Sequence, residues 1–79
     1  MSFQIIFVTE GPEWIPAIEI QFEGQRLCVV RRTQAGIAQI EFVKDVYVGK
    51  EVEMIFPIEE FLEIAQVAVA DLDSWLRNI

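Results

Sequence analysis

Residues 57–79 read PIEEFLEIAQVAVADLDSWLRNI and carry the longest regular hydrophobic pattern in the chain. Apolar residues return every three or four positions, which is the spacing of an amphipathic α-helix. These positions are Ile58, Phe61, Leu62, Ala65, Ala68, Val69, Leu72, Trp75, Leu76 and Ile79. Pro57 suits the first turn, because its missing N–H would have no partner there, and Glu59 and Glu60 suit the positive end of the helix dipole. The pattern predicts a helix over about residues 57–77, which needs a partner surface from the rest of the chain.

The residues before this helix carry the patterns of β-strands. Residues 3–8 form a continuous apolar run, and residues 17–23 alternate apolar side chains with polar ones, as a strand with one dry and one wet face does. The glycine-containing reversal at residues 23–25 predicts a hairpin. Lys44 and Asp45 interrupt a later alternation, so we expect a bulge or bend there. The predicted strands cover about residues 3–8, 17–23, 26–32, 37–43 and 51–56.

A run of strands followed by one helix indicates the α+β fold class. Consecutive strands usually neighbour each other in space, which favours an antiparallel meander. We therefore predict an antiparallel meander sheet of four to five strands, packed on one face by a single long C-terminal helix. With 79 residues and no linker or repeat, the chain is expected to form a single domain over residues 1–79. The helix residues expected to be buried against the sheet include Phe61, Leu62, Ala65, Leu72 and Leu76.

Composition limits the compartment and the partners of the protein. The net charge is −7, the hydrophobic fraction is 53%, and there is one cysteine. One cysteine allows no internal disulfide, and the first residues lack the basic region and cleavage site of a signal peptide, so we expect a cytoplasmic protein. No apolar run reaches the roughly 18 residues of a membrane span, which predicts no membrane insertion. The acidic balance disfavours phosphate backbones and anionic membranes as partners.

Residues suited to catalysis are scarce. The chain has no histidine, the commonest general base and metal ligand, and Cys28 lies in an apolar stretch typical of a buried structural thiol. Carboxylates are plentiful but follow no calcium-loop spacing, and the isolated glycines form no phosphate-binding loop. We therefore predict that the protein is not an enzyme and has no metal site and no cofactor.

One group of basic residues could form a nucleic-acid interface. Its members are Arg26, Arg31, Arg32, Lys44 and Lys50. Adjacent residues of a strand point to opposite faces, so Arg31 and Arg32 cannot share one surface. The alternative is cross-strand ion pairing of these bases, with partners drawn from Glu19, Glu23, Glu41 and Glu53.

The order of strands followed by a helix resembles the Whirly-like single-stranded-DNA coactivator architecture. That resemblance implies nucleic acid bound on the sheet. It covers the order of elements and no residue motif. Exposed aromatic residues for base stacking are few and the net charge is acidic, so the residues themselves favour other partners.

The apolar content exceeds what one helix can cover. Residues 3–8 and 26–32 are apolar on both faces, whereas one helix covers only one face of a sheet. An exposed apolar patch usually marks an interface, and closed two-fold pairing is the commonest way to bury it. The loop at residues 9–16 could instead fold under the sheet with Trp14, a residue that also suits a contact surface. The candidate interface residues are Ile6, Val8, Trp14, Cys28, Val30, Ile64 and Val67.

The leading hypothesis is a small non-catalytic protein that acts through protein–protein contact as a homodimer. A second hypothesis, from another class, is a single-stranded nucleic-acid-binding protein that uses the basic segment at residues 26–50. A third is an acidic inhibitor or immunity-type protein, which electrostatic steering would bring to a basic partner. The surface for that third function would comprise Glu51, Glu53, Glu59, Glu60 and Glu63.

Overall fold

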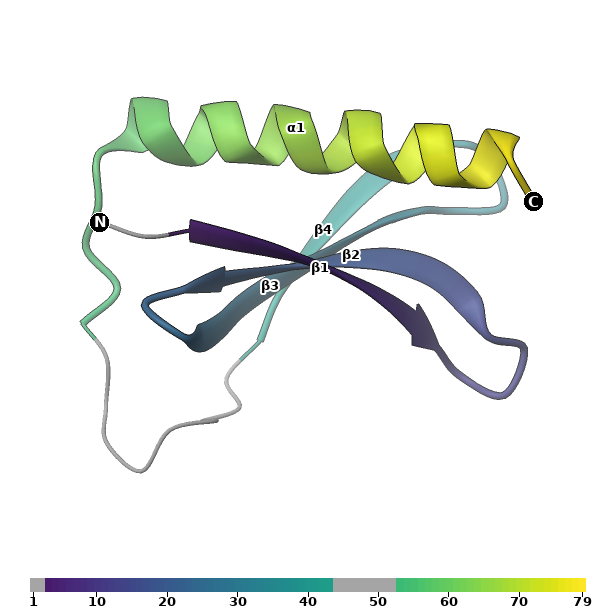
Figure 1. Cartoon of the computed structure of the whole chain (residues 1–79), viewed down its shortest axis with the longest axis horizontal. Coiled ribbons are helices and arrows are strands. Elements are labelled where there is room, and N and C mark those ends of the chain that lie inside the picture. The colour runs from purple at the N-terminus through teal and green to yellow at the C-terminus, as the bar shows by residue number, and fades with distance from the viewer. Residues whose placement is uncertain (1–2, 44–52) are drawn as a thin grey trace.

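The computed structural model describes residues 3–43 and 53–79 of the chain. Its elements are β1 (Phe3–Glu10), β2 (Ile15–Phe22), β3 (Gln25–Arg32), β4 (Ala38–Phe42) and α1 (Ile58–Arg77). The strands form one layer and α1 forms the other (Figure 1). α1 begins after Pro57, whose backbone is extended, and Glu59 and Glu60 occupy its first turn as the sequence predicted.

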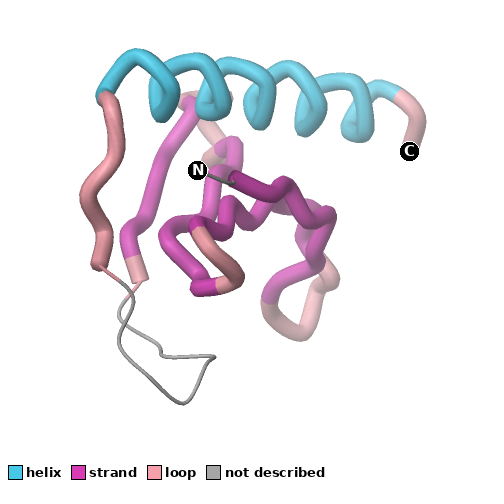
Figure 2. Tube along the Cα trace, turned by 60° about the vertical axis from the view of Figure 1, so that its left-hand side comes forward, coloured by secondary structure: helices cyan, strands magenta, loops and turns pink. Residues whose placement is uncertain are grey.

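The strands form one antiparallel sheet in the order β1-β2-β3-β4. Its register pairs Ile5 with Ile20 and Ile18 with Val30, which aligns the apolar residues that face α1. Short reversals join consecutive strands, and the strands fan out beneath the helix (Figure 2). The predicted α+β fold, an antiparallel meander with one C-terminal helix on one face, is confirmed, with four strands.

The predicted strand at residues 51–56 is wrong for the part that the structure describes. Residues 53–56 belong to no strand. Their alternation has another cause, because the ring of Phe56 packs on Phe3 and Phe22 at centroid distances of 5.0 and 4.9 Å. A period of two requires only that alternate side chains meet the protein, and it does not require a hydrogen-bonded neighbour strand. The segment is a connection that the aromatic contacts hold in place before α1.

The remaining predicted elements agree with the structure to within two residues at each end. β2 begins earlier than predicted and includes Pro16, which pairs with Thr9 of β1. The β2–β3 pairing extends only from Ile18, so the missing N–H of Pro16 removes no bond from that ladder. The bulge predicted at Lys44 and Asp45 lies outside the described residues.

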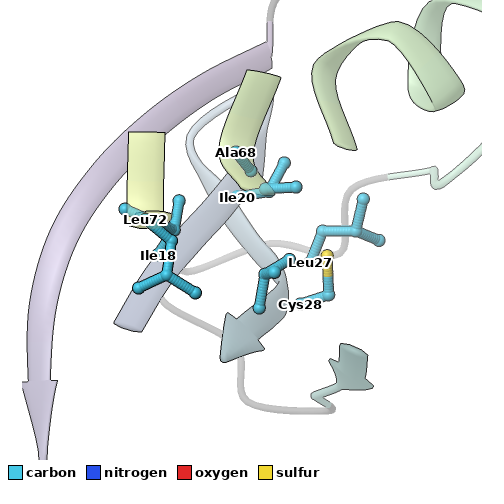
Figure 3. Close-up of a cluster of buried hydrophobic side chains, with 7 residues drawn as sticks. Ile18, Ile20, Leu27, Cys28, Ala68 and Leu72 are labelled. Carbon is cyan, nitrogen blue, oxygen red and sulfur yellow. The ribbon is translucent and has the colours of Figure 1, made fainter. Parts of the chain in front are cut away.

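The core lies between α1 and the two central strands (Figure 3). Ala68 and Leu72 of α1 are fully buried and face the isoleucines of β2. The small side chain of Ala68 allows the helix backbone to approach the sheet closely, while Leu72 fills the space toward the C-terminal end. The complete buried cluster comprises Ile18, Ile20, Leu27, Cys28, Val30, Ala68 and Leu72.

Aromatic contacts attach both ends of α1 to the sheet. At the N-terminal end, Phe61 packs on Phe56 with ring centroids 5.7 Å apart, and Phe3 completes the cluster. At the C-terminal end, Trp75 packs on Phe7 of β1 at 5.3 Å. Tilted and edge-to-face pairs at such distances contribute about 0.5–1.5 kcal/mol each beyond area burial. These contacts set the position of the helix across β2 and β3.

The face of the sheet away from α1 is drier than the alternating sequence of β2 predicted. Ala17 and Val29 are fully buried there, and Glu19, expected on the wet face, is only 4% exposed. The Glu19 carboxylate accepts a hydrogen bond from Gln21 Nε2 at 2.7 Å and lies 3.0 Å from Arg26 Nε. A carboxylate can be buried when it is paired and hydrogen-bonded, and arginine stems cover apolar surface. β2 is therefore buried on both faces.

Candidate interaction surface

The helix covers only part of the sheet. α1 packs mainly on β2 and β3. A helix with its side chains is about 10–12 Å wide and neighbouring strands lie about 4.8 Å apart, so one helix spans about two strands. All five residues of β4 are exposed, although the strand pairs with β3 along its whole length. Apart from the ring of Phe42, which stacks on Phe61 of α1 with centroids 6.1 Å apart, the described residues leave open the side of β4 that continues the α1-facing surface.

An apolar groove runs between α1 and β4. One depression of about 260 Å³ is lined by Val30, Ala38, Gln39, Ile40, Phe61, Ala65 and Val69. A second, of about 530 Å³, continues over the same flank of the helix and is lined by Leu62, Ala65, Gln66, Val69, Ala70 and Asp73. Ala65 and Val69 belong to both depressions. We call the joined surface the α1–β4 groove.

The apolar stripe of α1 is wider than the part that the sheet buries. Leu72 is buried, but Leu62 is 53% exposed and Leu76 is also exposed, so the prediction that both pack against the sheet is wrong. Each residue of an α-helix is rotated by about 100° around the helix axis from the residue before it, so five apolar residues of α1 lie within an arc of about 60° on the flank toward β4. The members of this flank are Ile58, Leu62, Ala65, Val69 and Leu76. These residues have the same helical spacing that predicted α1, so the sequence alone could have identified this apolar flank.

The predicted interface residues on β3 and α1 lie away from this flank. Cys28 and Val30 are buried in the core beneath α1, although the edge of Val30 contributes to the groove wall. Ile64 packs against the core from the opposite flank of the helix, and Val67 is exposed beside it. The apolar surplus expected on α1 is present, but its larger part faces β4.

The loop between β1 and β2 does not fold under the sheet, which was the alternative considered for both-face burial. Trp14 is 73% exposed and Ile15 is also exposed. The backbone of Trp14 has a φ of 57°, an uncommon conformation for a bulky residue, and its amide donates to the Gly11 carbonyl at 3.2 Å. Ile6 and Val8 lie on the face away from α1, with Ile6 the more exposed of the two. Of the predicted interface residues, Trp14 presents the most surface.

On the face away from α1, Arg31 joins three strands. Its Nε and Nη2 donate to the Glu10 carboxylate at 2.8 and 2.9 Å, and Nη2 also donates to Glu41 at 2.9 Å. This contact connects β1, β3 and β4. Hydrogen bonds from the guanidinium lower the pKa of Glu10, against the opposing effect of partial burial.

On the opposite face, Arg32 joins β3 to α1. Its Nε and Nη2 donate to the Asp73 carboxylate at 3.1 and 2.9 Å, and Nη1 donates to the Gly36 carbonyl at 2.9 Å. These hydrogen bonds lower the pKa of Asp73 and raise that of Arg32. Asp73 also lines the groove, so the ion pair marks one end of it.

The arginines of the predicted nucleic-acid surface thus all lie beside carboxylates. Arg31 and Arg32 point to opposite faces as expected, and the cross-strand partners Glu19 and Glu41 were among those named from the sequence. Glu10 and Asp73 were not, because they lie 21 and 41 residues from their arginines and only the fold brings them close. The remaining members of that group, Lys44 and Lys50, lie outside the described residues.

The acidic residues of α1 occupy a different side of the helix from the groove. Glu60 and Glu63 line a shallow depression of about 230 Å³ between α1 and β1, together with Phe3, Ile64 and Val67. Glu59 and Glu53 are exposed as well. Glu51 of the predicted acidic surface lies outside the described residues.

The described residues present little that suggests covalent or metal chemistry. Within residues 3–43 and 53–79, no three His, Cys, Asp or Glu side chains lie close enough together to hold a metal ion. Cys28 is free and buried, and burial raises its thiol pKa to about 11, so the thiol is protonated at neutral pH and is a poor nucleophile. No helix in this part of the chain is both long and apolar enough to cross a membrane.

In comparisons with known proteins, no protein-family model matches the chain, and no curated protein or solved structure gives a significant match. The feature that distinguishes its surface is the α1–β4 groove.

Proposed function

We propose that the protein is a small non-catalytic interaction protein, and that a second copy of the chain fills the α1–β4 groove to form a homodimer. The observation that carries this proposal is the apolar α1–β4 groove, together with the exposed apolar side chains that α1 and β4 carry. Ile58 is 66% exposed, Phe42 59%, Leu62 53% and Ile40 41%. A contiguous apolar surface of this kind is rare on monomers and usually marks an interface.

The exposed apolar side chains are sufficient for a reversible dimer. The four exposed fractions amount to about two complete side chains per protomer, and burying one Leu, Ile or Phe contributes about 1.5–3 kcal/mol. Two protomers would gain about 6–12 kcal/mol from these residues, against an association cost of about 4 kcal/mol or more. The difference is at most about 8 kcal/mol, and a value of about 7 kcal/mol, near its upper end, corresponds to a Kd on the order of 10 µM, so we expect a reversible dimer and not a permanent complex.

The margins of the groove also fit an interface. Gln39 and Gln66 border the apolar centre, as the polar rim of a protein–protein interface does. In the described part of the chain β4 pairs with β3 on one side only, so its other edge offers backbone N–H and C=O groups to a partner. The buried free thiol of Cys28 fits the reducing cytoplasm, which is the compartment we propose.

The test is the mass of the protein in solution, measured by light scattering and analytical ultracentrifugation between 5 and 200 µM (about 0.5–20 times the expected Kd). We expect the wild type to pass from its 9.1 kDa monomer toward twice that mass. Leu62→Lys should keep the protein monomeric, because it places a charge in the apolar lining of the groove. The matched control is Val67→Lys, an equal charge change at an exposed position on the opposite flank of α1.

Two results would contradict the proposal. A monomeric mass for the wild type throughout this concentration range would refute the homodimer. A dimer that persists in Leu62→Lys but dissociates in Val67→Lys would refute the groove and move the interface to the flank that carries Ile64 and Val67. Circular dichroism of both variants should show the wild-type helix content, since neither residue is part of the buried core.

The arrangement of the arginines argues against the nucleic-acid alternative. Arg26, Arg31 and Arg32 each have a carboxylate within 3.1 Å, which reduces the local positive potential that a phosphate backbone would need. Fluorescence anisotropy with single-stranded and duplex oligonucleotides checks this directly. Micromolar binding that weakens steeply with salt would favour the alternative over the homodimer.

A further inference from the structure

We infer that the two copies pair their α1 helices antiparallel across the groove, with Glu59 of each helix beside Arg77 of the other; this rests on the proposed homodimer. The α1–β4 groove leaves one flank of the helix open along its length. A second α1 is the element of this chain with a matching long apolar flank. The two helices could run parallel or antiparallel to each other, and the charges at the two ends of α1 favour the antiparallel direction.

The ends of α1 carry opposite charges on the same side of the helix. Glu59 lies in the first turn and Arg77 in the last turn. They are 18 residues apart, which is about five complete turns, so both lie on the outer rim of the groove flank. Antiparallel pairing places each Glu59 beside the partner's Arg77, and it also opposes the two helix dipoles. Parallel pairing would instead bring the acidic first turns together.

The shape of the flank is also compatible with reversal of direction. Of its large exposed side chains, Ile58 and Leu62 lie toward the N-terminal end and Leu76 lies toward the C-terminal end, and the small Ala65 and Ala70 lie between them. Turning the helix end to end therefore places Ile58 near Leu76 of the second copy and lets the backbones approach near Ala65. A two-fold interface requires this self-complementarity, because each residue set must meet a copy of itself.

Among the described residues, Glu59 and Arg77 form no ion pair, although the charge of Arg77 helps to lower the pKa of Asp73. Glu59 and Arg77 are separated by about 27 Å along a single helix, so they cannot pair with each other in one protomer. Asp73, one turn before Arg77, already accepts two hydrogen bonds from Arg32. An energetic coupling between positions 59 and 77 would therefore arise between copies.

A charge-reversal cycle read out as the dimer Kd tests the inference. Glu59→Arg and Arg77→Glu should each weaken dimerisation about fivefold, and the double variant should return to within about twofold of the wild type. The matched control replaces Glu59→Arg with Glu60→Arg, which changes the same charge in the same turn but on the other flank. Recovery is expected with position 59 and not with position 60.

Disulfide formation provides a readout that does not depend on affinity or on the helix ends. In an equimolar mixture of Ile58→Cys and Leu76→Cys, antiparallel pairing predicts mainly the mixed disulfide, whereas parallel pairing predicts the two like-with-like products. Cys28 is buried with a raised thiol pKa and should not compete. Like-with-like products, or no recovery in the charge-reversed double variant, would overturn the antiparallel arrangement while a Leu62→Lys-sensitive dimer would still support the proposed function. A monomeric wild type would overturn both.

Discussion

Replacement of Leu72 by alanine should remove a large share of the stability of this small domain. Leu72 is fully buried between α1 and β2, whereas Leu62, on the same helix, is 53% exposed. A fully buried Leu→Ala change costs about 3–5 kcal/mol, because transfer energy is lost and a cavity remains. A 79-residue domain has a total of about 4–12 kcal/mol, so Leu72→Ala should lower Tm by at least about 10 °C.

The matched substitution Leu62→Ala makes this expectation specific. It removes the same atoms, but about half of the Leu62 side chain is already in water and no closed cavity is left, so the cost in the monomer should be about 1 kcal/mol. Urea unfolding followed by circular dichroism would give both free energies. The measurement must be made below the dimer Kd, since self-association adds apparent stability that depends on protein concentration. Equal costs for the two variants would refute the assignment of Leu72 to the core and of Leu62 to the groove.

Two further predictions concern an ion pair and a loop. The fold lowers the pKa of Glu10 from its ordinary value of 4.5, so the stability that the Glu10–Arg31 ion pair contributes is complete above about pH 5 and is lost as the pH falls through the lowered value. Glu10→Gln should therefore cost about 1 kcal/mol of unfolding free energy at pH 7 and almost nothing at pH 2. Urea unfolding at both pH values would measure this, and an equal cost at both would contradict the prediction. Trp14 has a left-handed backbone and is largely exposed, so Trp14→Asn should leave Tm unchanged or raise it by a few degrees, whereas a drop of about 5 °C or more would mean that the Trp14 ring stabilises the fold.

The sequence by itself determined α1, the four strands of the sheet and their order. α1 could be predicted because its apolar residues recur at a helical period, and β2 because its side chains alternate. The meander followed because short reversals leave little choice but antiparallel neighbours. Each of these features depends on residues close together in the chain.

Other features depended on contacts that no local pattern records. Phe56 alternates with its neighbours as a strand residue would, but it packs among rings from β1, β2 and α1. Glu19 occupies a polar position of β2, yet the fold buries it beside Gln21 and Arg26. In both cases the alternation of side chains is present in the sequence. Contacts with residues distant in the chain decided that Phe56 lies in a connection and that Glu19 is buried.

Only the tertiary structure decided where the candidate site lies. Leu62 and Leu72 satisfy the same helical spacing, and nothing in that spacing says which of them the sheet will cover. The answer depends on the lateral position of α1, which packs through Ala68 and Leu72 on the buried residues of β2 and β3. A single helix is about two strands wide, so the described residues leave most of β4 and the facing flank of α1 uncovered, and that geometry creates the groove.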